Sequence, residues 1–77
     1  MPNAEALKQE LIESNESFRR LHDEHRDCER RLHAIAMKTL LSQEDEAEEK
    51  RIKIHKLALK DQMERMLREL RETQVSA

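Results

Sequence analysis

The stretch FRRLHDEHRDCERRLHAI, residues 18–35, decides the fold. Within it, mostly apolar side chains recur at alternating steps of three and four residues. This spacing keeps one face of a helix, here called the seam, against a partner helix. Counted backwards with the same period, the stripe reaches Leu11 and Leu7, so residues 4–13 are expected to be helical, and whether they continue the first helix is open. The stripe consists of Phe18, Leu21, His25, Cys28, Leu32 and Ile35.

A second stripe with the same spacing follows later in the chain, and its members are Ile52, Lys56, Leu59, Met63, Met66 and Leu70. A turn near residue 40 would pair the two stripes antiparallel, so that Phe18 meets Met63 and His25 lies opposite Lys56. One register satisfies most of both stripes. We therefore predict an all-α, antiparallel two-helix hairpin with coiled-coil-like packing, to which a short N-terminal helical extension could be added.

Local signals predict where the helices begin. Asn15 is a candidate N-cap for the first helix. Ser42, with Asp45 three residues later, resembles a capping box for the second helix. The expected segments are a first helix at about 15–38, a turn at about 39–42 and a second helix at about 43–72, all within a single helical-hairpin domain over 1–77.

Composition narrows the functional classes. The chain has 77 residues, of which 42% are charged, with 15 Lys and Arg against 17 Asp and Glu and a net charge of −2. This balance disfavours non-specific nucleic-acid binding, which depends on net positive charge. No apolar run approaches the roughly 20 residues that span a bilayer, and the N-terminus lacks the pattern of a signal peptide. We expect a cytoplasmic protein without a membrane segment, and lone Cys28 cannot form an intrachain disulfide.

The motif HDEHRDC, residues 22–28, has the residue types of a metal site. Tetrahedral zinc usually needs four ligands, and the predicted register supplies the cation of Lys56 opposite His25 instead of a further ligand. The Glu-x-x-His spacing of di-iron bundles does not occur at any histidine of the chain. A two-helix hairpin also offers little interior for a water-excluding pocket. We therefore expect no metal, no cofactor and no catalytic residues.

Two segments carry a family resemblance. RLHDEHRDCERRLH followed by KRIKIHKLALKDQME resembles the YdcH-like family of small bacterial proteins, a domain of unknown function, over roughly residues 15–67. The first helix of that family usually opens with Asn-Pro-Glu-Phe, whereas NESF here has Asn15 and Phe18 but Glu16 in place of the proline. The resemblance implies a helical hairpin in the bacterial cytoplasm and supplies no catalytic residues.

A small apolar face on the back of the second helix suggests association. The predicted hairpin leaves this face uncovered, so we expect a non-enzymatic homo-oligomer, with a dimer favoured, or an adaptor for another protein. The alternative is a nucleic-acid-associated regulator that uses the basic run at 50–60, although the acidic residues just before it oppose this. The candidate interface consists of Ala47, Ile54, Leu57 and Ala58, and the basic run of Lys50, Arg51, Lys53, Lys56 and Lys60.

Overall fold

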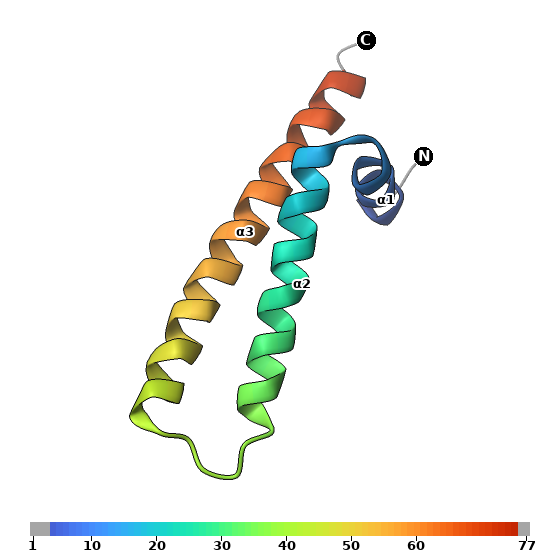
Figure 1. Ribbon diagram of the computed structural model, residues 1–77. Helices are drawn as coiled ribbons and strands as arrows, with labels where there is room; N and C mark the ends of the chain where they lie inside the picture. Colours follow the sequence, from blue (N-terminus) through green and yellow to red (C-terminus); the bar gives the residue numbers. More distant parts are fainter. Residues whose placement is uncertain (1–3, 76–77) are drawn as a thin grey trace.

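The computed structural model describes residues 4–75, and this part of the chain is built from helices without a strand (Figure 1). The all-α prediction is confirmed. The predicted two-helix hairpin is wrong in its number of helices, because the described residues form three: α1 (Ala4–Ser14), α2 (Glu16–Ala36) and α3 (Gln43–Val75). Helices α2 and α3 run antiparallel, and α1 is a separate helix at the end of the hairpin opposite the loop (Figure 1).

A single residue separates α1 from α2. Asn15 has an extended backbone, with φ −125° and ψ 112°, and its side-chain Oδ1 accepts a hydrogen bond from the Phe18 N–H at 3.0 Å. The N–H of the same residue still donates to the Leu11 carbonyl at 2.8 Å, as in a continuing helix. Asn15 therefore completes the last turn of α1 and caps the first turn of α2, which satisfies donors that a helix start would otherwise leave open.

The direction of α1 follows from burial. Leu7 and Leu11 are buried, and Leu11 packs in one cluster with Phe18 of α2 and Met63 of α3. Helix α1 therefore contributes to the core that lies between α2 and α3. The heptad stripe does continue into this segment, but the extended conformation at Asn15 turns the chain away from the axis of α2. The N-terminal segment is thus neither a straight continuation of the first helix nor a loose extension.

The core between α2 and α3 consists of two clusters joined at Leu21. The cluster nearer the loop contains Cys28, Ile35, Ile52 and Leu59, with Leu21 and Leu32 packed against it. The cluster nearer α1 contains Leu11, Phe18 and Met63, with Ile12, Leu21, Met66, Leu67 and Leu70 packed against it. Phe18 and Met63 therefore share a cluster, as the antiparallel register predicts.

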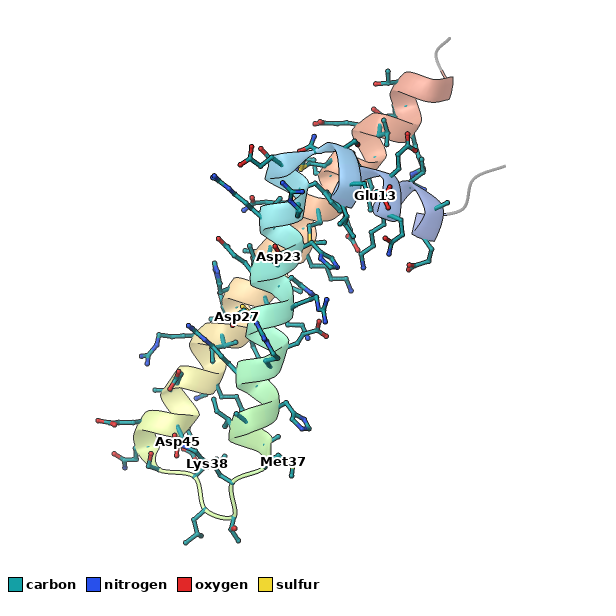
Figure 2. The ribbon with its side chains drawn as sticks, turned by 45° about the vertical axis from the view of Figure 1, so that its right-hand side comes forward. Glu13, Asp23, Asp27, Met37, Lys38 and Asp45 are labelled. Carbon is teal, nitrogen blue, oxygen red and sulfur yellow. The ribbon has the colours of Figure 1, made fainter. Side chains whose placement is uncertain are left out.

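The loop over residues 37–42 is held by a reciprocal cap. The Ser42 N–H donates to Asp45 Oδ2 at 3.1 Å, and the Asp45 N–H donates to Ser42 Oγ at 3.0 Å, which is the predicted capping box. Lys38 Nζ lies 2.7 Å from Asp45 Oδ1 and links the two ends of the loop (Figure 2). The hydrogen bond from Lys38, and then the bond from the Ser42 backbone, lower the pKa of the Asp45 carboxyl. Helix α2 ends at Ala36, slightly before the predicted boundary.

Candidate interaction surface

The outer face of α3 is the main apolar surface on the sides of the hairpin. Ile54 and Leu57 are 71% and 68% exposed, whereas Ile52 and Leu59 on the same helix are 6% and 3% exposed. The difference follows from helical geometry, because Ile52 and Leu59 point towards α2 and the other pair lies about half a turn away. The alanines of the predicted interface, Ala47 and Ala58, are also exposed, so the four residues of this outer face are all accessible.

Ten of the twelve predicted seam residues belong to the two core clusters, and the other two, His25 and Lys56, line the cleft beside the core. Phe18, Cys28, Ile35, Ile52, Leu59 and Met63 are buried, and Leu21, His25, Leu32, Lys56, Met66 and Leu70 are half-buried. The two polar seam residues, His25 and Lys56, therefore lie at the margin of the core, where solvent still reaches their side chains.

Charged side chains flank the outer face of α3. Lys50 and Asp61 lie about 40° and 20° from Ile54 around the helix, at about 100° per residue, and both are exposed. Within residues 4–75, neither side chain forms an ion pair. Lys53, by contrast, is paired with Glu49 at 3.4 Å along its own helix. The outer face thus combines an apolar centre with accessible charges of both signs, and the exposed Arg65 and Arg68 lie on the same side further along the helix.

A second apolar surface lies at the loop end of the hairpin. Leu40 is 88% exposed, Met37 is 72% exposed and Leu41 is 41% exposed. Our sequence reasoning did not identify this surface. The signal was present, because three large apolar residues within a five-residue stretch are unusual in a connection, which is normally polar.

The basic run is mostly on one side of α3, but half of its charge there is already paired. At about 100° per residue, Lys50, Lys53, Lys56 and Lys60 lie within a sector of about 120°, and Arg51 lies outside it. Lys56 Nζ lies 3.7 Å from Glu29 Oε2, and Lys53 is neutralised by Glu49. Nucleic-acid backbones are bound by a continuous positive face. The geometry therefore gives no specific support to the nucleic-acid alternative.

A polar cluster marks the place where all three helices meet. Glu29 lies between His25 and Lys56, with Oε1 3.4 Å from His25 Nδ1 and Oε2 3.7 Å from Lys56 Nζ, so His25 and Lys56 are near each other as the register predicts. A cleft of about 320 Å³ opens beside them. Its lining residues are Lys8, His25, Glu29, Lys56, Lys60, Met63, Glu64 and Leu67.

The HDEHRDC motif is dispersed around α2. Within residues 4–75, three or more His, Cys, Asp or Glu side chains do not gather in an arrangement that could hold a metal ion. His22 Nδ1 lies 3.8 Å from an oxygen of its neighbour Asp23, and His25 faces Glu29. Cys28 is buried, and this burial raises the pKa of its thiol. The thiol is therefore less readily ionised than an exposed one, and it acts as a small apolar side chain of the core.

The environment of His25 predicts a dependence of stability on pH. Burial lowers the pKa of His25 below its ordinary value of 6.5; Glu29 raises it, and Lys56, Lys8 and His22 lower it further. The Nε2 atom is buried without a hydrogen-bond partner among the described residues. The folded state therefore favours the neutral ring. Below pH 6.5 the unfolded chain binds more protons than the folded chain, so stability is lost as the pH falls from 6.5 towards the folded pKa.

We expect the His25→Gln variant to lose less stability than the wild type over this pH range. Urea denaturation at about pH 7.5 and about pH 5.5 measures the difference. His33→Gln is the matched control, because His33 lies on the same helix and is exposed. An equal loss of stability in the wild type and in His25→Gln would contradict the prediction.

The fold and these surfaces define a class: a small helical-hairpin protein with accessible apolar patches and no membrane-crossing helix within residues 4–75. The model of the family described as a protein of unknown function (DUF465) matches residues 18–67, and the chain belongs to this family. The YdcH-like resemblance is consistent with this assignment. The match covers most of α2, the loop and most of α3, and it leaves α1 outside. Searches of curated proteins and of solved structures found no match.

Proposed function

We propose that this protein is a non-enzymatic association module that forms a homodimer through the outer face of α3. The observation that carries the proposal is the exposure of Ile54 and Leu57, at 71% and 68%, in the middle of a regular helix. Apolar side chains that form a patch on a helix are typical of helix–helix interfaces, because association removes them from water. An adaptor that presents the same face to another protein is the related alternative, and the cytoplasm is the setting we propose.

The size of this face predicts the strength of association. Each copy contributes two large aliphatic side chains and two alanines, which is a small apolar area. Burial of such a face gives a modest free energy, part of which is lost with the freedom of the two separate molecules. We therefore expect a dissociation constant in the micromolar range, and a dimer that exchanges with monomer at ordinary protein concentrations.

The Ile54→Glu variant is expected to raise the dissociation constant by about 100-fold or more, which corresponds to about 2.7 kcal/mol. The reason is that each dimer would bury two carboxylates at the centre of the interface without a partner. Sedimentation equilibrium over a range of concentrations measures this, and circular dichroism checks that the helices remain formed.

Leu40→Glu is the matched control for this experiment. It makes the same kind of change at a residue that is 88% exposed at the loop end, away from the outer face of α3. We expect its dissociation constant to equal that of the wild type. Loss of association in Leu40→Glu but not in Ile54→Glu would place the contact at the loop. A wild-type protein that is monomeric at concentrations of tens of micromolar would overturn the proposed dimer.

A further inference from the structure

We infer that the two copies pack their α3 helices antiparallel, about a two-fold axis beside Ile54 and Leu57, so that Lys50 of each copy pairs with Asp61 of the other. This inference rests on the proposed self-association and adds its geometry. The partner is a second copy of this chain, recognised by the charges along the outer face of α3.

The spacing of residues along α3 gives the register. Suppose that Ile54 of one copy lies against Leu57 of the other. In an antiparallel pair, a residue a given number of positions before Ile54 then faces the residue the same number of positions after Leu57 in the other copy. Lys50 is four residues before Ile54, and Asp61 is four residues after Leu57. The two charges of opposite sign therefore meet, and two-fold symmetry creates the pair twice. Both side chains are exposed, and neither has an ion-pair partner within residues 4–75 of its own chain.

A parallel arrangement has the opposite electrostatics. Each residue would then lie against its own copy, which brings Lys50 to Lys50 and Asp61 to Asp61 at the centre of the contact. Like charges placed directly opposite each other disfavour an interface. The choice between the two directions is therefore decided by the sign of two facing charges, and the apolar residues alone would allow either direction.

The charge distribution along the whole of α3 also favours the antiparallel arrangement. The first turns of the helix are acidic, with Glu44, Asp45, Glu46, Glu48 and Glu49 within its first seven residues. The later turns carry Arg65, Arg68 and Arg71. An antiparallel contact sets the acidic beginning of each α3 beside the basic later part of the other, and it also opposes the two helix dipoles.

The outer face of α3 is free to make this contact. The residues of α3 that pack against α2, such as Ile52 and Leu59, lie on the opposite side of the helix. Lys60 lines the cleft beside α1 and α2, so its charge is directed away from the proposed axis. Two hairpins can therefore join through α3 while α1 and α2 remain on the outside of the dimer.

Reversal of the two charges tests the pairing. Lys50→Glu alone, or Asp61→Lys alone, places like charges together in the antiparallel dimer and should raise the dissociation constant about tenfold or more. The double variant should return to the wild-type value. An equimolar mixture of the two single variants should also associate like the wild type, because each chain supplies the charge that the other lacks. Three variants that all associate like the wild type would overturn the pairing.

Disulfide crosslinking tests the direction independently, in full-length protein with Cys28→Ala. Lys50 is four residues before Ile54 and Asp61 is four residues after Leu57, so the antiparallel dimer brings position 50 of one copy close to position 61 of the other. A mixture of Lys50→Cys and Asp61→Cys chains should form mixed disulfides under mild oxidation, and neither chain alone should. Crosslinks from Lys50→Cys alone would show a parallel dimer. Because Ile54→Glu tests association without reference to direction, it separates failure of this geometry from failure of the dimer itself.

Discussion

Phe18→Ala is expected to lower the free energy of unfolding by about 3–5 kcal/mol, the range found when a large buried aromatic side chain is truncated. Phe18 is fully buried, with 0% of its surface exposed, and it packs with Leu11 from α1 and Met63 from α3. The side chain thus fills the place where all three helices meet. Truncation of this side chain removes buried apolar surface. It also leaves a cavity between the three helices, which can relax only partly to fill it.

Urea denaturation followed by far-ultraviolet circular dichroism measures this change. Small domains have total stabilities near the low end of about 5–15 kcal/mol, so the variant should retain only about 0–2 kcal/mol and unfold at a much lower urea concentration than the wild type. Ser17→Ala is the matched control at the neighbouring position, because Ser17 is exposed, and its effect should remain within about 0.5 kcal/mol. A loss below about 1 kcal/mol in Phe18→Ala would show that α1 does not seal this end of the core.

The second large effect is expected at Leu59, where Leu59→Ala should cost about 2–5 kcal/mol of stability. Leu59 is 3% exposed and belongs to the cluster with Cys28, Ile35 and Ile52 between α2 and α3. Leu57→Ala makes the same chemical change two residues away on the same helix. Because Leu57 is 68% exposed, the stability of the single chain should change by less than about 0.5 kcal/mol.

The comparison of these two leucine variants separates folding from association. Unfolding should be measured at several protein concentrations, since only association makes the apparent stability depend on concentration. Leu59→Ala should lower stability at every concentration, whereas Leu57→Ala should remove only the part that grows with concentration. Equal costs at Leu57 and Leu59 would mean that the orientation of α3 about its own axis is wrong.

The pairing of α2 with α3 could be predicted because it depends on local spacing. The apolar positions of Phe18 and Cys28 on one helix, and of Ile52 and Met63 on the other, repeat with the helical period. Any hairpin turn near residue 40 must bring the two stripes together. Short-range hydrogen bonds likewise allowed the caps at Asn15 and Ser42 to be predicted from residue type alone.

The accessible surfaces were only partly predictable. The outer face around Ile54 and Leu57 followed from its angle to the predicted seam, which is again a matter of helical period. The apolar loop around Leu40 did not follow, because a connection has no period, and its exposure depends on how the chain crosses between the helices. The cleft beside His25 and Glu29 needs α1 in place, so it also could not be predicted from a two-helix arrangement.

The sequence by itself determined that the chain is helical, where α2 and α3 face each other and which apolar residues lie on the outer face of α3, because these properties repeat within a few residues. Only the tertiary structure decided the position of α1. The heptad spacing continues in register from Phe18 back to Leu11 and Leu7, with the polar Ser14 at the position between, so period alone could not distinguish a straight helix from a folded one. The extended conformation at Asn15, together with burial of Leu7, Leu11 and Phe18 where the three helices meet, makes that choice.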